Sequence, residues 1–561
     1  MNFRISKGRG RRARRLTLAL MTAAVVGGAV TSAQSDGGLF PFPVFFSGNL
    51  VVSRSVYDNN PNNVTVGETL PPNCASTTGG CSPGATNNGT YPAVWNNALS
   101  DGSFGITSTI FLDQITPWGW LVNSLEVPNS SQKGITTVSD QLVTSFSSKS
   151  ELALNLSSDH NYLTFMDYVA PVDALDVSNS NTPGEVDPTN PVGENNFRAV
   201  AQVDQWGKFH FTETNAYSGN NGRAAILNSS WDTNVFYTAG NAGNGSNPQP
   251  DGIIIGAGAQ ILTPEYEALS AQDPGSPTPV GSFNVTQLGD TADKIGKDTN
   301  FRGLTIFDNV LYYSKGSGGN GINTVYFVDT TGTVCTGTSG DGLPESSAGL
   351  PTAGIDYTTS LLQTEGVVPY NMCVLKGFPT TLSKTTTYFP FGIWFANANT
   401  VYIADEGNGD NTYSTTTGTY TMAASQTTAG LQKWVFNSTT QQWNLAYTLQ
   451  AGLALGTPYT VAGYPTGNNS ATGPPWAPAT DGLRNLTGVV NRNRTATIYA
   501  ITSTVSGNGD QGADPNKLVV ITDNIAATTL PAESFTTVRS AGNLEVLRGV
   551  SFTPGTGVAR P

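Results

Sequence analysis

The sequence has few of the residues on which most catalytic sites depend. It contains two histidines and four cysteines in 561 residues, and only 12% of its residues are charged. His160 is expected in a hairpin turn and His210 inside an outer strand, where structural roles are more common. A Ser-His-Asp triad, a two-histidine copper site and a zinc site are therefore disfavoured. No Gly-x-Ser-x-Gly or phosphate-cradling loop stands between a strand and a helix.

Basic residues are scarce outside the N-terminus. Residues 1–16 hold seven Lys and Arg side chains, including the adjacent Arg14 and Arg15, and no acid. An apolar run up to Val30 and small residues up to Ala33 follow, which is the pattern of a secretory signal peptide. The arginine pair leaves a twin-arginine signal as an alternative to the general secretory signal. No later segment reaches about 18 apolar residues, so we expect a secreted or periplasmic protein without a membrane span.

The expected mature chain, residues 34–561, is acidic. Loss of residues 1–33 removes seven of the 27 basic residues and no acid, so the formal net charge changes from −13 to −20. Binding to nucleic acid requires clustered Lys and Arg to neutralise phosphates, and this class of partner is excluded. The partners that remain are a small molecule, a glycan or a surface protein, and we expect a monomer.

The four cysteines fit an oxidising compartment. Cys74 and Cys81 flank a turn-rich loop, and Cys335 and Cys373 can close a larger one. We expect the pairs 74–81 and 335–373, although four cysteines allow three connectivities.

Short apolar strands bounded by Gly, Asn, Asp and Pro recur along most of the chain, and no amphipathic helix stands out. A recurring β-unit of this kind indicates a propeller or a solenoid. Five sets of four strands are expected, at 151–156, 162–167, 197–204 and 209–214; 223–229, 234–238, 252–261 and 281–287; 302–307, 310–314, 323–329 and 372–377; 391–396, 400–404, 431–436 and 443–449; and 484–490, 497–503, 517–522 and 535–539.

The two ends of the chain supply the strands of one more unit. Residues 547–552 read as a first strand with nothing after it, whereas 50–54, 108–113 and 120–127 read as a second, third and fourth strand. Pairing them closes the ring and removes exposed sheet edges. The sequence therefore predicts an all-β fold, a single β-propeller of six blades, with seven as the alternative if two blades are merged in 128–200.

Long Gly/Ser/Thr/Asn-rich insertions, such as 331–370, 407–429 and 455–480, lengthen the units. We expect them to be surface loops, where function usually concentrates. Strands recur without an intervening linker, so 34–561 is expected to be one domain.

Two stretches carry a resemblance to known propeller repeats. The run Thr-Val-Tyr-Ile-Ala-Asp-Glu-Gly-Asn at 400–408, followed by Gly-Leu-Gln-Lys-Trp-Val-Phe at 430–436, resembles the repeats of NHL-like proteins. The run Leu-Ser-Ser-Asp-His-Asn-Tyr at 156–162 resembles the hairpin of YVTN-type surface-layer propellers, with His160 where that pattern has Gly. The resemblance implies the propeller fold, and it leaves hydrolase, dehydrogenase, lyase and binding functions open.

Charged residues recur at two places in the units, at the end of the second strand and at the start of the first. In a propeller both places lie near the central opening, where Arg can act as a bidentate donor to an anionic or polyhydroxylated ligand. The alternative is that an Arg of one blade pairs with an acid of its neighbour and ties the blades together. The expected ligand-binding residues are Arg54, Asp167, Arg302, Lys315, Arg484 and Arg548.

The densest group of oxygen donors contains Asp405, Glu406 and Asp410. Ca²⁺ takes several carboxylate and carbonyl oxygens on a flexible loop, so these residues are the candidate metal ligands. The alternative is a solvated turn, because the loop lacks the spacing of an EF-hand.

These observations favour a ligand- or surface-binding scaffold of unknown specificity, and they leave open whether the protein is an enzyme. One alternative is a Ca²⁺-dependent hydrolase, similar to a lactonase, with acidic residues at the central tunnel. The other is a quinoprotein-type sugar dehydrogenase, which the scarcity of histidine as a general base disfavours. The pair Trp118 and Trp120, if exposed, would suit stacking on a sugar.

Overall fold

The structure is a computed structural model that describes residues 43–70, 85–86, 105–136, 141–190, 192–229, 233–243, 259–264, 300–316, 322–331, 333–334, 341–352, 372–381, 386–470, 472–508 and 511–557. All of them belong to the unit of residues 35–561.

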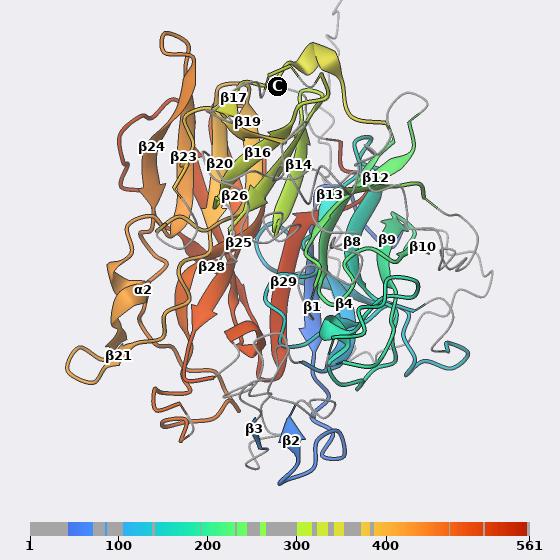
Figure 1. Cartoon of the computed structure of the whole chain (residues 1–561). Helices are drawn as coiled ribbons and strands as arrows, with labels where there is room; N and C mark the ends of the chain where they lie inside the picture. Colours follow the sequence, from blue (N-terminus) through green and yellow to red (C-terminus); the bar gives the residue numbers. More distant parts are fainter. Residues whose placement is uncertain are drawn as a thin grey trace, which may run out of the picture. The chain divides into compact units, whose positions relative to one another are not determined.

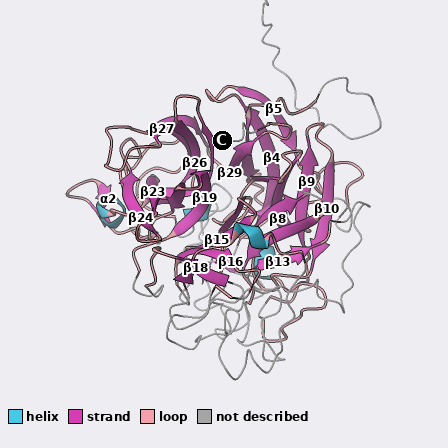
Figure 2. Ribbon diagram, turned by 90° about the horizontal axis from the view of Figure 1, so that it is seen from above, coloured by secondary structure: helices cyan, strands magenta, loops and turns pink. Residues whose placement is uncertain are grey.

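Six sheets form a ring, and the fold is a six-bladed β-propeller (Figure 2). From the inner strand outwards, blade 1 consists of β29 (Glu545–Phe552), β1 (Leu50–Val56), β4 (Thr107–Ile115) and β5 (Leu121–Glu126); blade 2 of β7 (Asn155–Leu156), β8 (Tyr162–Tyr168), β9 (Arg198–Asp204) and β10 (Phe209–Thr214); and blade 3 of β11 (Gly222–Asn228), β12 (Val235–Gly240) and β13 (Ala259–Leu262).

The other three blades follow in chain order. Blade 4 consists of β14 (Gly303–Phe307), β15 (Val310–Lys315), β16 (Thr324–Val328) and β18 (Met372–Leu375), with β17 (Asp341–Gly342) at its edge; blade 5 of β19 (Pro390–Asn397), β20 (Thr400–Asp405), β23 (Gly430–Asn437) and β24 (Gln442–Leu449); and blade 6 of β25 (Ala479–Val490), β26 (Thr495–Val505), β27 (Lys517–Asn524) and β28 (Thr536–Ser540).

Small elements lie in the connections. They are β2 (Thr69–Leu70), β3 (Ala85–Thr86), β6 (Thr144–Ser145), β21 (Tyr413–Ser414), β22 (Thr419–Tyr420), the helix α2 (Thr421–Ser425) and the 3₁₀ turns η1 (Val177–Asn179), η2 (Ser346–Ala348) and η4 (Gln511–Ala513). In the part of the chain that the structure describes, no helix is long and apolar enough to cross a membrane.

The pairing of the chain ends is confirmed. β1 and β29 are antiparallel neighbours from Leu50 opposite Phe552 to Val56 opposite Glu545, and β1 pairs on its other side with β4. In Figure 1 the blue β1 and the red β29 lie side by side. The C-terminal strand thus completes the blade that the N-terminal strands begin and closes the ring.

The burial of the strands follows from the stacking of the blades. Every residue of β16 and of β20 is buried, whereas β28 at an outer edge is mostly exposed. A middle strand is covered on both faces by the neighbouring blades, so it favours apolar and β-branched residues throughout.

The six inner strands surround the axis of the ring, each in contact with its two neighbours, in the order β29, β7, β11, β14, β19, β25 and back to β29. Glycine permits this approach. A Cβ atom at Gly303 would lie 2.4 Å from the carbonyl oxygen of Phe391, and one at Gly392 would lie 2.7 Å from that of Arg484. The recurring glycine of the first strand is therefore a requirement of packing between blades.

The predicted strands agree with the observed ones, although β7 is shorter and β25 longer than expected. The expected strand 281–287 lies outside the described residues, and only β13 of 252–261 lies within them. The insertion 407–429 contains the hairpin β21–β22 and α2, and 331–370 contains β17 and η2.

Candidate functional site

Charged side chains gather around the axis at the first half of the inner strands. Four arginines are buried there: Arg223 near the start of β11, Arg302 just before β14, and Arg484 and Arg548 within the first halves of β25 and β29. Neighbouring members of this group interact electrostatically with one another or with acids of the adjacent blade. The arginines between blades 5 and 6 and the arginine beside blade 2 have different partners.

Between blades 5 and 6 the charges form a direct ion pair. Nε of Arg484 lies 3.2 Å from Oε2 of Glu406, and both side chains are nearly buried. Burial alone would raise the pKa of Glu406, but Arg302, Arg484 and Lys149 outweigh it and lower this pKa. Glu406 is therefore a carboxylate held among three cations.

Arg302 completes this group from blade 4. Its side chain is 6% exposed, and its Nε has no hydrogen-bond partner among the described residues. Burial lowers the pKa of Arg302, Glu406 opposes this effect, and Arg484 adds to it. Arg223 of blade 3 also has a buried Nε without a partner, and its nearest cationic neighbour is Arg302. Arg223 and Arg302 thus interact electrostatically with a carboxylate that is already paired with Arg484.

The arrangement in blade 2 is different because acids predominate there. Glu151 accepts hydrogen bonds from the hydroxyl of Tyr168 and from Nδ2 of Asn221 at 2.8 Å. Burial, followed by the charge of Glu151, raises the pKa of Asp167 well above its usual range. Arg548 interacts electrostatically with Asp167, and its guanidinium donates to Ser55 and to the backbone carbonyls of Ser145 and Phe146, at the end of β6, which pairs with β4 of blade 1.

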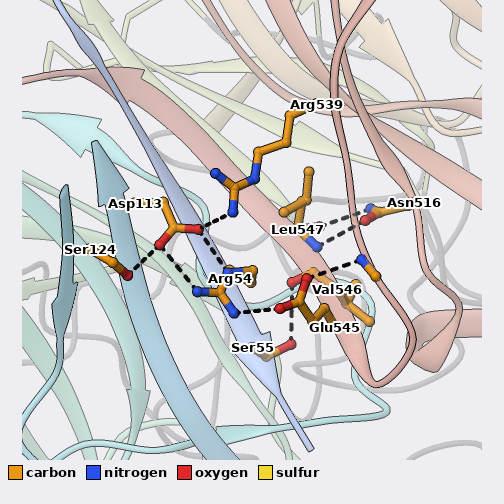
Figure 3. A network of polar contacts seen from close by, with 10 residues as sticks. Arg54, Ser55, Asp113, Ser124, Asn516, Arg539, Glu545, Val546 and Leu547 are labelled. Atoms are coloured by element: carbon orange, nitrogen blue, oxygen red, sulfur yellow. Dashed lines mark hydrogen bonds and ion pairs between the residues drawn. The ribbon is translucent and has the colours of Figure 1, made fainter. Parts of the chain in front are cut away.

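Two of the predicted residues lie apart from this group. The ammonium of Lys315 is buried in blade 4 and donates to Oδ1 of Asn323 at 3.0 Å. Arg54 lies in a network at the closure of the ring (Figure 3), where its Nε and Nη1 donate to Asp113 at 2.7 Å and to Glu545 at 2.8 Å. The register of β1 against β29 shifts between Ser53 and Arg54, and such an irregularity re-aims a side chain.

The Arg54 network joins both ends of the chain and the neighbouring blade. Asp113 of β4 is fully buried and also accepts from Arg539 of β28 at 2.8 Å and from Ser124 (Figure 3). For Arg54 the structure thus favours the role of a tie between strands, which was the alternative to ligand binding.

Replacement of Arg54 by alanine is expected to lower the free energy of unfolding by about 2 kcal/mol, because Asp113 stays buried with Arg539 as its remaining cation. Urea denaturation would measure the change, and Arg492→Ala, on the exposed β25–β26 turn, is the control. An unchanged free energy would show that this network does not stabilise the closure.

The candidate calcium ligands have other partners. The carboxylate of Asp405 accepts from the backbone N–H groups of Phe389 at 2.9 Å and Gly407 at 3.0 Å, and Glu406 is paired with Arg484. Asp410 accepts from the backbone of Thr412. Within the described ranges, no group of three or more His, Cys, Asp or Glu could hold a metal ion. The calcium site remains a prediction that metal titration would test.

Three charged residues near the axis were not anticipated: Lys149, Glu151 and Asp481. Glu151 opens the first strand of its unit, where other units have arginine, so the alignment of the units could have revealed it. Asp481 lies in the part of β25 that precedes the expected strand, and its carboxylate accepts from the backbone of Gly409 at 2.8 Å. No pattern in the sequence marks Lys149.

A separate cavity of about 320 Å³ lies at the second half of the inner strands. All six inner strands contribute to its wall, which includes Trp394, Phe307, Leu486 and Thr487. His160, in the β7–β8 turn, also lines it. The axis of the ring therefore has a charged region and an uncharged region.

Other sequence expectations have mixed outcomes. Trp118 and Trp120 are exposed, at 81% and 75%, as sugar stacking would require. His210 lies in the outer strand β10, as expected. Cys373 is buried in β18 and takes part in a disulfide, whereas the other three cysteines lie outside the described residues, so the pairing stays a prediction.

No protein-family model and no curated protein matches the chain. Among solved structures, the chain is similar to a GH74 enzyme of Niastella koreensis, with 10% identity and a TM-score of 0.28 over 79% of this chain and 55% of that one. It is also similar to a PL25 ulvan lyase, with 10% identity and a TM-score of 0.28 over 82% of this chain and 93% of that one. The chain spans 55% of the length of the first of these structures. Likenesses at this level carry no argument about activity.

Proposed function

We propose that the protein is an exported binding scaffold that holds a small anionic ligand at the arginine-rich part of its axis. The observation that carries the proposal is the buried guanidinium of Arg302, whose Nε has no hydrogen-bond partner in the described structure. A buried donor without a partner costs free energy, and a buried charge costs more. A carboxylate or sulfate of a ligand would supply the missing acceptor.

The balance of charge around Arg302 supports an anion in preference to a cation or a neutral ligand. Arg223, Arg302, Arg484 and Lys149 all interact electrostatically with Glu406. Among these described residues, Arg484 forms a direct ion pair with that carboxylate. The chain has a net charge of −13, so this local excess of positive charge does not follow from its composition.

Arg302→Met distinguishes ligand binding from a tie between blades. If Arg302 binds a ligand, its guanidinium lacks an acceptor in the unliganded protein. Its replacement by methionine then removes an unpaired buried charge, and the free energy of unfolding of the unliganded protein should rise by about 2 kcal/mol. The same substitution should abolish the rise in melting temperature that anions cause in the unchanged protein. Thermal unfolding with sulfate, inorganic phosphate and galacturonate measures both effects, because a ligand of the native state raises the midpoint.

Matched controls accompany this experiment. Galactose has the shape of galacturonate without its charge and should leave the midpoint unchanged, and Arg492→Ala should keep the response to anions. A lower melting temperature of Arg302→Met, with no anion response in the unchanged protein, would show that Arg302 only ties the blades together.

A further inference from the structure

The uncharged cavity at the second half of the inner strands has the size of a small-molecule site. Its volume of about 320 Å³ lies within the range of such sites, roughly 300–1,000 Å³. None of the described residues in its wall is Asp, Glu, Lys or Arg. Apolar and aromatic side chains predominate, among them Ile226, Phe307, Trp394 and Leu486, and hydroxyls such as Thr305 and Ser551 stand between them. This lining favours an uncharged, largely apolar ligand over an anion or an extended glycan.

His160 is the only titratable residue among the described members of the wall, and one of its ring nitrogens is already engaged. Its Nδ1 lies 3.0 Å from the carbonyl oxygen of Thr556. A carbonyl oxygen can only accept, so Nδ1 must carry the proton. In the neutral ring Nε2 is then an acceptor, and the hydrogen bond at Nδ1 fixes this tautomer.

The backbone at His160 adopts a conformation that favours glycine. Its φ is +62°, in the left-handed region, inside a turn where His160 N–H donates to the carbonyl of Ser157 at 2.8 Å. The side chains of Ser157 and Asp159 hold the same turn, since Ser157 Oγ donates to Asp159 at 2.6 Å. A side chain in this conformation carries a backbone cost that glycine avoids, and such a residue at a cavity suggests a function for the side chain.

We infer that this cavity binds an uncharged, mainly apolar small molecule that bears a hydroxyl, and that Nε2 of His160 accepts the hydrogen bond from that hydroxyl. The aromatic and aliphatic wall around Trp394 and Phe307 removes the apolar part of the ligand from water. This site is distinct from the arginine group, which lies at the first half of the inner strands.

Three naphthalene derivatives test the inference by isothermal titration calorimetry. 2-Naphthol has a hydroxyl donor, 2-methoxynaphthalene lacks the donor, and 2-naphthoate is charged. The protein should bind 2-naphthol about tenfold more tightly than 2-methoxynaphthalene, because this ratio corresponds to the free energy of one net hydrogen bond. It should not bind 2-naphthoate in this cavity.

His160→Gly should keep or raise the melting temperature. It should lower the affinity for 2-naphthol to the level of 2-methoxynaphthalene, and the affinity for 2-methoxynaphthalene should not change. Thr487→Phe, which fills the cavity, should weaken the binding of both compounds, whereas His210→Gln and Arg302→Met should leave both unaffected. The inference is overturned if the unchanged protein does not bind 2-naphthol. It is equally overturned if His160→Gly retains the preference for 2-naphthol, or if Thr487→Phe binds both compounds as tightly as before.

Discussion

Replacement of Lys433 by methionine should lower the free energy of unfolding by about 4 kcal/mol. Lys433 of β23 and Asp523 of β27 form an ion pair at 3.0 Å between blades 5 and 6, and both side chains are 0% exposed. Asp523 also accepts from the hydroxyls of Tyr402 and Tyr447. Without the ammonium, a carboxylate would remain buried between two blades with no cation beside it, which is the costly outcome for a buried pair.

The loss has a second source in the backbone. Nζ of Lys433 donates to the carbonyl oxygen of Asn524, the last residue of β27, at 2.7 Å and to that of Ala527, just beyond it, at 2.9 Å. Methionine fills a similar volume but cannot donate to either carbonyl, so the segment that follows β27 also loses its anchor to blade 5. We expect urea denaturation monitored by circular dichroism to show the full change.

A double variant separates the charge from the packing. Lys433→Met combined with Asp523→Asn removes both charges of the buried pair, and it should recover more than half of the stability that Lys433→Met loses. Equal stability of the single and double variants would mean that the buried charge is not the source of the loss.

The second large effect is on the dependence of stability on pH. Burial, with a smaller contribution from the charge of Glu406, raises the pKa of Asp405 and of Asp481 to about 7. Backbone N–H donors at both carboxylates oppose this but do not cancel it. In the unfolded chain both groups titrate near 4, so the native protein binds more protons than the unfolded chain between about pH 4 and pH 7.

The sign follows from this difference in bound protons. The free energy of unfolding should fall as the pH rises from about 4 to about 7, by at most about 4 kcal/mol for each carboxyl. Asp167, whose pKa is also raised by burial, contributes in the same direction. Glu406 has a lowered pKa, and its contribution is lost only as the pH falls below about 4.5, so we expect maximal stability near pH 4.

Guanidinium denaturation at pH 5, 6, 7 and 8 measures this dependence. Asp481→Asn should remove a large part of the decline towards pH 8, whereas Asp410→Asn, a half-buried residue of the loop that follows Asp405, should leave the decline unchanged. A decline of the same size in Asp481→Asn and in the unchanged protein would refute the assignment of the raised pKa to Asp481.

The six-blade architecture could be predicted from the sequence because its determinants are local or periodic. The apolar runs of β15 and β20 depend on residues next to one another, and the close approach at Gly303 and Gly392 recurs at Gly549 of blade 1. The closure was also predictable, because a lone first strand at 547–552 and three strands without a first one at 50–127 complete each other.

The candidate site was only partly predictable, because its members meet through the stacking of blades. Arg302 and Arg484 were selected by their place in the unit, and they do approach Glu406. Arg54 was selected by the same rule, but a shift of register turned it towards Asp113 and Glu545. Periodicity gives the place of a residue along a strand, whereas a local irregularity decides where its side chain points.

The amino-acid sequence by itself determined that this chain forms a closed ring of β-blades with arginines at the starts of its inner strands. Only the tertiary structure decided which of those arginines are paired, and it alone placed His160 beside Leu486 and Phe307 in one cavity. The reason is physical: a strand is specified by its neighbours in sequence, whereas the contacts around the axis join residues of different blades, many tens of positions apart in the chain.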